Sequence, residues 1–88
     1  MVYYVYFIKT LDGYPVKTYV GYTNNLKRRI DLHNNSKGAK FTRGRKWKLI
    51  YKEVYRTKKE AISREYYIKN NRSLRKKIKN EYFSTTTI

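Results

Sequence analysis

The fold is decided by two neighbouring stretches, residues 2–9 (VYYVYFIK) and residues 16–22 (VKTYVGY), which consist mainly of β-branched and aromatic residues. Such residues favour β-strands, and the near-continuous apolar run of the first predicts a strand that is covered on both faces. Between them lie residues 11–15 (LDGYP), in which Asp-Gly supplies a tight bend and proline opens the return. The sequence therefore predicts an antiparallel hairpin.

Beyond the hairpin, capping residues and apolar spacing predict a helix, a loop and a third strand. Thr23 or Asn24 is a candidate N-cap for a helix that ends near Asn34, with Leu26 and Ile30 facing inward one turn apart. Residues 35–46 form a predicted exposed basic loop, and residues 47–55 a predicted strand. Two further helices follow.

In the first of these helices, Thr57 is the expected N-cap and Asn70 the approximate end. Ser73 is the expected cap of the last helix, and an apolar stripe of that helix ends at Tyr82. The element order is β-β-α-β-α-α, which predicts an α+β fold with a three-stranded antiparallel sheet flanked by helices. At 88 residues the chain fits one domain. We expect this domain to cover residues 1–82, followed by a flexible tail at residues 83–88.

The charge of the chain points to a polyanionic partner. It carries 22 Lys and Arg against six acidic residues, a net charge of +16. Nucleic acid, DNA rather than RNA, is the expected partner, because so high a positive charge on a small protein attracts phosphates. We expect no membrane partner, since the apolar runs are too short to span a bilayer. The absence of cysteine and of an export signal favours a cytoplasmic protein.

A carboxylate stands where the second predicted helix should be apolar. At 100° per residue, Glu65 falls within the arc spanned by Ala61, Ile62 and Ile68. An ionised carboxylate at such a position needs a partner. Glu65 is therefore either paired with a nearby Arg or Lys, or a ligand for a hard divalent cation such as Mg²⁺, which binds one or two carboxylates together with water and phosphate oxygens.

Two residues of the first predicted helix lie on the same face and are suited to phosphate chemistry. Arg29 and His33 lie one turn apart. Arginine can hold a phosphate and stabilise transition-state charge, whereas histidine can act as an acid, a base or a hydrogen-bond donor. For His33, the one histidine of the chain, the simpler interpretation is a surface or helix-end residue.

Tyr6 and Tyr19 lie on adjacent strands of the predicted hairpin. A phenol becomes a useful base only where neighbouring cations lower its pKa, and Arg29 together with a metal at Glu65 is expected to do so. The simpler interpretation is that they are ordinary strand residues, because the chain has eleven tyrosines. Gly21 indicates a close approach by backbone or substrate, since glycine is otherwise unfavourable within a strand.

Cations on the first helix and the predicted loop are candidates for phosphate contacts, and an aromatic among them can stack an unpaired base. Trp47 is expected to be buried instead, and the alternative for the loop is a solvated segment. The candidate nucleic-acid-binding residues are Lys27, Lys37, Lys40, Arg43, Arg45 and Lys46.

In this order and spacing, the sequence resembles a GIY-YIG nuclease domain, and most of all the small single-domain branch of that superfamily. The segments that carry the resemblance are Tyr4-Val5-Tyr6, Tyr19-Val20-Gly21, residues 25–29 (NLKRR), His33, residues 37–44 (KGAKFTRG) and residues 61–65 (AISRE), which run into Ile68-Lys69. Two positions depart from the family pattern. Tyr4 stands where the first motif usually begins with glycine, and Tyr22 where some members carry a lysine.

The resemblance implies metal-dependent phosphodiester hydrolysis with a single Mg²⁺ or Mn²⁺ ion. By position, Tyr6 and Tyr19 are the motif tyrosines, of which one would orient or deprotonate the attacking water. Arg29 would be the transition-state arginine, His33 the residue that the family carries as His or Tyr, and Glu65 the metal ligand.

Three hypotheses follow. The first is an endonuclease that acts on DNA, with branched, damaged or single-stranded forms as candidate substrates. The second is a non-catalytic nucleic-acid-binding protein that retains the nuclease fold, and the third is a basic component of a ribonucleoprotein.

Overall fold

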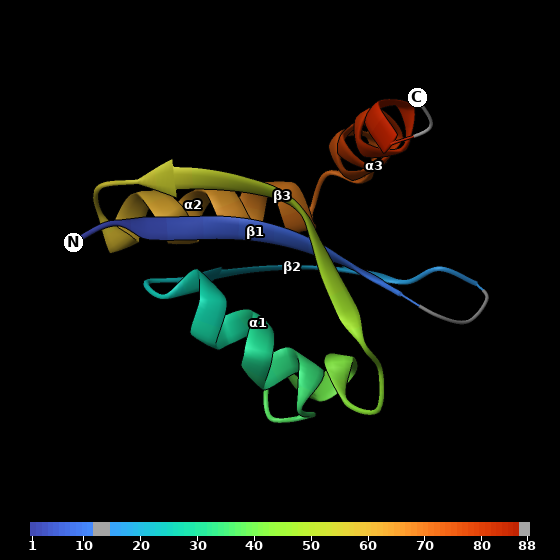
Figure 1. Ribbon diagram of the computed structural model, residues 1–88. Coiled ribbons are helices and arrows are strands. Elements are labelled where there is room, and N and C mark those ends of the chain that lie inside the picture. The colour runs from blue at the N-terminus through green and yellow to red at the C-terminus, as the bar shows by residue number, and fades with distance from the viewer. Residues whose placement is uncertain (12–14, 87–88) are drawn as a thin grey trace.

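The computed structural model describes residues 1–11 and 15–86, with side chains up to residue 82, so the turn predicted at residues 12–14 lies outside the described residues. Its elements follow one another in the predicted order (Figure 1). They are β1 (Tyr3–Thr10), β2 (Thr18–Thr23), α1 (Leu26–Asn34), the 3-10 helix η1 (Lys40–Thr42), β3 (Trp47–Tyr55), α2 (Lys58–Lys69) and α3 (Arg72–Thr86).

The three strands form one antiparallel sheet in the order β2-β1-β3, which confirms the predicted α+β fold. β1 is therefore central, as its continuous apolar run predicts, and β2 is an edge strand. Tyr6 lies opposite Gly21 of β2. Against β3 the register shifts between Phe7 and Ile8, so that Ile50 has no opposite residue and forms a bulge.

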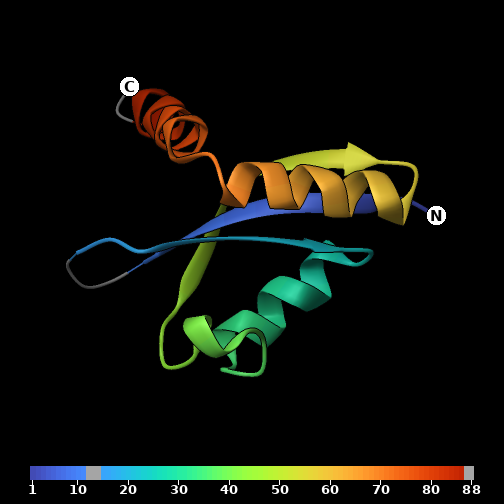
Figure 2. The same cartoon turned by 180° about the vertical axis from the view of Figure 1, so that it is seen from behind.

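Helices cover both faces of the sheet, with α1 on one side and α2 on the other (Figures 1 and 2). The strand alternation divides the core accordingly. Tyr6, Ile8 and Trp47 are buried on the face of α1, where Leu26 and Ile30 pack against them as predicted. The second cluster, on the face of α2 and α3, consists of Val5, Phe7, Val20, Ala61, Ile68 and Ile78.

The caps of the helices differ from their predicted positions in two of three cases. Asn25, and not Thr23 or Asn24, caps α1 by accepting from the backbone N–H of Arg28. Thr57 caps α2 as predicted, and this helix ends at its C-cap Asn70. For α3, Asn71 takes the place predicted for Ser73, because its side chain accepts from the N–H of Leu74.

Two other expectations need correction. Ile62, predicted on the buried stripe of α2, is 41% exposed, so the buried stripe consists of Ala61 and Ile68. α3 continues past the predicted domain boundary at residue 82 to Thr86, so residues 83–86 are helical and not a tail. Residues 87–88 lie outside the described residues. Among the described helices, none is both long and apolar enough to span a bilayer.

Candidate active site

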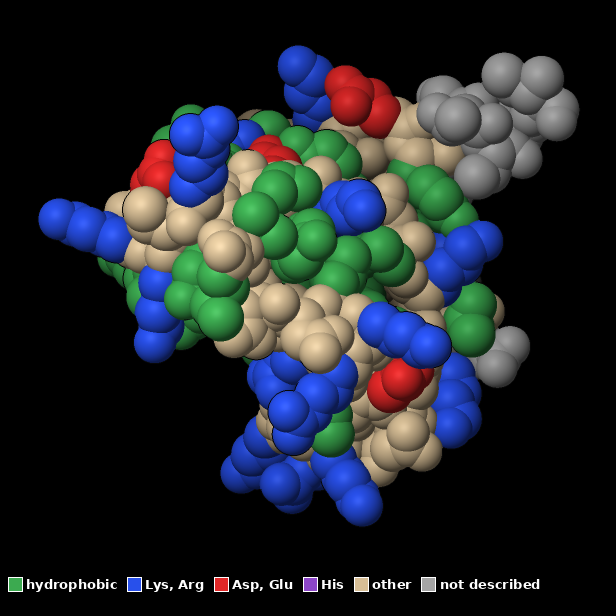
Figure 3. Space-filling view, turned by 60° about the vertical axis from the view of Figure 1, so that its left-hand side comes forward, with side chains coloured by type: hydrophobic (Ala, Val, Ile, Leu, Met, Phe, Trp, Pro, Cys, Tyr) green, Lys and Arg blue, Asp and Glu red, His purple; other side chains and the backbone are tan. Residues whose placement is uncertain are grey.

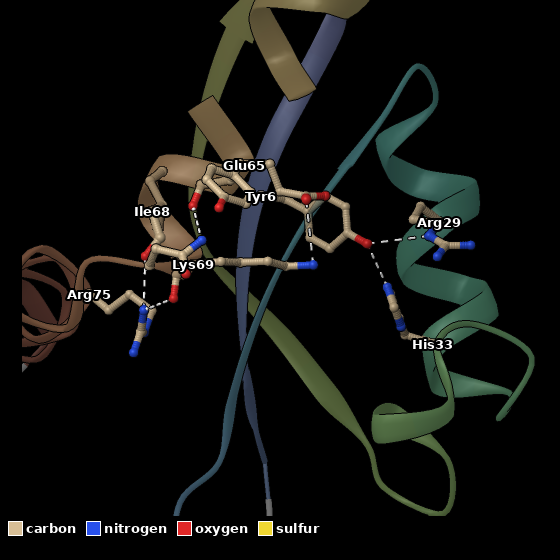
Figure 4. A network of polar contacts seen from close by, with 9 residues as sticks. Tyr6, Arg29, His33, Glu65, Ile68, Lys69 and Arg75 are labelled. Carbon is tan, nitrogen blue, oxygen red and sulfur yellow. Dashed lines mark hydrogen bonds and ion pairs between the residues drawn. The ribbon is translucent and has the colours of Figure 1, made fainter. Parts of the chain in front are cut away.

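Tyr6 of β1 is the centre of a polar network that joins the sheet to α1. Its side chain is fully buried. Its hydroxyl oxygen lies 2.7 Å from Nε2 of His33 and accepts a hydrogen bond from Nε of Arg29 at 3.3 Å. The helical spacing of Arg29 and His33 therefore brings both side chains to the same phenol, as Figure 4 shows.

The direction of the hydrogen bonds in this network follows from Thr42 of η1. Its hydroxyl donates to the carbonyl of Ala39 at 2.8 Å, so its oxygen accepts from Nδ1 of His33, also at 2.8 Å. A neutral imidazole with a proton on Nδ1 has Nε2 free to accept, and Tyr6 donates to it. The phenol, the imidazole and the hydroxyl thus form a chain in which each member donates to the next.

The electrostatics of the site agree with this assignment. Burial, with a smaller effect of the Arg29 charge, lowers the pKa of His33 to about 4, which keeps the imidazole neutral. Burial also raises the pKa of Tyr6 to about 12, although Arg29 acts in the opposite direction. Arg29 thus acts on the Tyr6 pKa in the expected direction, but it does not by itself bring this pKa below its ordinary value, because loss of solvation outweighs the guanidinium.

Two glycines make room for the buried rings. A Cβ atom on Gly21 would lie 2.3 Å from the Tyr6 hydroxyl, so the close approach predicted at this glycine is that of a phenol from the neighbouring strand. A Cβ on Gly38 would lie 2.3 Å from Nδ1 of His33. The loop after α1 can therefore close over His33 only with glycine at position 38, and His33 is fully buried rather than a surface residue.

Glu65 reaches the same region from α2, on the other side of the sheet. Its side chain is 18% exposed, and Oε1 lies 3.5 Å from Nζ of Lys69. The negative charge of Glu65 also raises the pKa of Tyr6, although much less than burial does. Because β2 is the edge strand, side chains of α2 can pass this edge toward Tyr6, as Figure 4 shows for Glu65 and Lys69.

Tyr19 lies at that edge between the two helices. It is half-buried, its ring centroid is 5.3 Å from that of His33, and Nζ of Lys69 lies 5.2 Å from the Tyr19 centroid. On its other side, Phe41 is nearly parallel to it at 6.2 Å. Tyr19 thus connects the polar network of α1 with the Glu65–Lys69 ion pair of α2.

The structure therefore brings the five predicted catalytic residues into one region beside β2: Tyr6, Tyr19, Arg29, His33 and Glu65. Sequence reasoning missed the roles of Lys69 and Thr42. Lys69 had a signal, since it stands one turn after Glu65 and shares its face. Thr42 had none, because it meets His33 only through the fold of the loop.

The donor set around Glu65 fits a single hard cation. Within the described residues, no group of three or more His, Asp or Glu side chains is close enough to hold a metal. A closed protein cage is thus not formed there, but Mg²⁺ commonly binds one carboxylate together with water and phosphate oxygens, and the Glu65 side chain is partly exposed. The ammonium of Lys69 shows that this carboxylate already attracts a cation.

The six predicted phosphate-contacting cations are exposed, and Lys27 lies on α1 whereas the others belong to the loop that follows. Two of them also have contacts within the protein: Lys46 donates to the carbonyl of Asn34, and Arg45 to that of Phe41. Figure 3 shows Lys and Arg side chains gathered most densely at its lower edge, at the height of α1 in Figure 1. Contact with phosphates stays a prediction.

Trp47 is buried, as predicted, and donates its indole N–H to the carbonyl of Thr42 at 3.0 Å. Of the two positions that depart from the family pattern, Tyr22 packs against the core on the opposite face of the sheet. Tyr4 lies on the same strand face as Tyr6, with Nζ of Lys52 5.8 Å from its ring centroid.

The comparisons with known proteins agree with this fold. The sequence model of the GIY-YIG catalytic domain matches residues 2–79. A UPF0213 protein of Clostridium perfringens is 55% identical over 75% of this chain and 69% of its own length, and one of Staphylococcus saprophyticus is 44% identical over 86% and 89%. The solution NMR structure of a UPF0213 protein from Bacillus halodurans has 35% identity and a TM-score of 0.56, and the match covers 100% of this chain and 97% of that one. The chain belongs to the GIY-YIG family, among the small single-domain proteins designated UPF0213.

Proposed function

We propose that this protein is a divalent-metal-dependent endonuclease that hydrolyses DNA phosphodiester bonds, with branched, damaged or single-stranded DNA as its substrates. One observation carries the proposal: two phenols, a guanidinium, an imidazole and a carboxylate from β1, β2, α1 and α2 converge at the edge of one strand. The net charge of +16 supports a phosphate-rich substrate.

Arg29 is the residue that would stabilise the negative charge of the transition state. Its Nε donates to Tyr6, which fixes the side chain beside the phenol. The two terminal nitrogens make no hydrogen bond within the described residues and are available to a phosphate. A guanidinium held in place before the reaction stabilises developing negative charge without reorganisation.

Of the two motif tyrosines, Tyr19 is the better candidate to touch the attacking water. Tyr6 is fully buried, its proton is donated to His33, and its pKa is about 12. His33 in turn is a weak proton acceptor at a pKa of about 4. We assign to Tyr6 and His33 the role of holding Arg29 in place and of forming one wall of the site. Tyr19, which is half-buried at the strand edge, would orient the water.

Glu65 would hold the cation, Mg²⁺ or Mn²⁺, whose chemistry when bound is to act as a Lewis acid toward phosphoryl oxygens. Lys69 competes for the same carboxylate, because its ammonium lies 3.5 Å from Oε1. With a cation held by Glu65, the Lys69 ammonium would be free to contact the substrate phosphate.

The test is cleavage of single-stranded, duplex and branched DNA in Mg²⁺, in Mn²⁺ and in EDTA. Glu65→Gln should reduce the rate of metal-dependent cleavage at least about 100-fold, without changing the thermal midpoint of unfolding by more than a few degrees. Glu60→Gln is the matched control, since Glu60 is an exposed carboxylate in the first turn of the same helix. Cleavage that survives in Glu65→Gln would refute the assignment.

A second function is favoured by one observation, the pairing of Glu65 with Lys69. A carboxylate neutralised by a lysine suits a non-catalytic nucleic-acid-binding protein that keeps the nuclease fold. DNA binding without cleavage in every metal condition would support this alternative, and a preference for RNA in the same assay would favour a ribonucleoprotein component.

A further inference from the structure

A basic hollow lies beside α3, outside the catalytic group described above. It has a volume of about 640 Å³, within the size range of ligand sites. Four of its side chains are cationic, and among the described residues that line it none is acidic. The lining consists of Phe7, Thr18, Arg72, Ser73, Arg75, Lys76, Lys79 and Asn80.

The cations of this hollow form one row on the helix. Arg72, Arg75, Lys76 and Lys79 follow the i, i+3, i+4, i+7 spacing, which places them on a single face of α3. Arg72 and Lys76 are exposed. The apolar residues Leu74 and Ile78, by contrast, pack toward the core. α3 therefore has two distinct faces, an apolar face that packs on the core and a cationic face that can bind negatively charged groups.

A second, smaller hollow connects this row to the candidate active site. It has a volume of about 240 Å³ and shares Thr18 and Arg75 with the first hollow. Its remaining lining includes Tyr19, Phe41 and Lys69, which belong to or border the catalytic group. The two hollows therefore adjoin at Thr18 and Arg75, and together they define a path over the surface from α3 to Tyr19.

Arg75 fixes the geometry at the junction of the two hollows. Its guanidinium donates to the carbonyl of Ile68 at 2.9 Å and also to that of Lys69 (Figure 4). These bonds tie the first turn of α3 to the end of α2, the helix that carries Glu65. Phe41 also lines the smaller hollow and is 49% exposed. Tyr19 lies nearly parallel to its ring, and the guanidinium of Arg45 is 5.9 Å from its centroid, so a stacked base would contact the exposed part of this ring.

We propose that this path, the α3 track, binds an unpaired nucleic-acid strand that flanks the position held at Tyr19, with Arg72, Lys76 and Lys79 contacting successive phosphates and Phe41 stacking a base. A single row of cations serves one strand, whereas an exposed aromatic can stack only a base that is not paired. The track rests on the proposed function for its placement beside a cleavage position, and it identifies the substrate class as DNA with a single-stranded segment.

The experiment measures binding in EDTA, so that it does not depend on cleavage. Fluorescence anisotropy would be recorded with labelled oligo(dT) of increasing length and with a duplex of matched length. The track variant is Arg72→Gln/Lys76→Gln/Lys79→Gln. The control is Lys58→Gln/Lys59→Gln/Lys77→Gln, which removes the same charge from exposed positions outside the hollows.

Loss of three phosphate contacts should reduce the salt slope for single strands by about 2 and weaken oligo(dT) binding about 100-fold at 0.1 M salt. The control should change affinity less than about fivefold, and the track variant should lose the gain in affinity that longer oligonucleotides show with the wild type. Circular dichroism of both variants checks that α3 is intact, and Phe41→Ala should weaken binding without any loss of charge.

Equal losses in the track variant and the control would overturn the proposal, because they would show a general charge effect. A loss for the duplex as large as that for oligo(dT) would also overturn it. The outcome is separate from that of the cleavage test: a protein that binds strands through the track but cuts none refutes the endonuclease and leaves the track in place.

Discussion

Lowering the pH from 7 to 4.5 is expected to destabilise the fold through His33. The side chain is fully buried, and its pKa is about 4 in place of its ordinary value of 6.5. Between these values the unfolded chain binds a proton that the folded protein does not. The stability supplied by the neutral imidazole is therefore complete above pH 6.5 and is lost as the pH falls toward 4.

The magnitude follows from the two pKa values. At pH 4.5 an unfolded histidine is almost fully protonated, whereas a folded one with a pKa of about 4 is mostly neutral. The difference lowers the free energy of unfolding by roughly 2–3 kcal/mol relative to pH 7. Such a change is a large part of the stability of a domain this small.

Urea denaturation at both pH values, for the wild type and for His33→Gln, isolates this contribution. Gln cannot be protonated, so the wild type should lose roughly 2–3 kcal/mol more stability than the variant between pH 7 and 4.5. Glu53 does not interfere, although burial alone would raise its pKa, because hydrogen bonds from Arg64, Tyr51 and Tyr55 lower this pKa to about 2. Its contribution is lost mainly below pH 4.5 and is the same in both proteins. Equal pH dependence in wild type and variant would refute the buried, neutral histidine and with it the directed chain from Tyr6 to Thr42.

Two further predictions concern the packing around this chain. Gly21→Ala should lower the free energy of unfolding by about 1–3 kcal/mol, because its Cβ would meet the Tyr6 hydroxyl at 2.3 Å. Gly44→Asn is the control and should have little effect, because position 44 is open and has a φ of 78°. Equal urea midpoints for the two variants would contradict the predicted overlap with Tyr6. Trp47→Phe should cost about 1–3 kcal/mol, because it leaves the Thr42 carbonyl without the indole donor. An unchanged urea midpoint for Trp47→Phe would show that the indole does not hold η1 against the sheet.

The elements of the fold were predictable because their signals are local. The apolar run of β1 indicated a central strand, and the sheet order places it there. Caps were harder, since Thr23, Asn24 and Asn25 are all chemically suitable. In the structure the Thr23 hydroxyl accepts from the N–H of Asn25, and the Asn25 side chain accepts from Arg28. Which residue caps the helix depends on how the chain leaves β2, and composition does not contain that information.

The site was predictable in its residues but not in their environments. Spacing brought Arg29 and His33 to one face, yet it gave no sign that the loop would bury His33 beneath Gly38. Nor did spacing show that burial would outweigh Arg29 at Tyr6 and raise the pKa of the phenol. Both outcomes depend on contacts between segments distant in the sequence, which determine solvation.

The environments of these residues determine which substitutions can test catalysis without disturbing the fold. Tyr6 belongs to the same buried cluster as Ile8 and Trp47, and its polar partners are satisfied within the protein, so loss of activity in Tyr6→Phe would be explained equally well by a damaged core. Glu65 has no such structural role beyond one ion pair with a half-exposed lysine. Because a single ion pair that is partly open to solvent contributes little to stability, and Gln keeps the size and polarity of the side chain, Glu65→Gln should leave the fold intact. Glu65 is therefore the position at which function and stability separate, and substitutions there test the chemistry rather than the core.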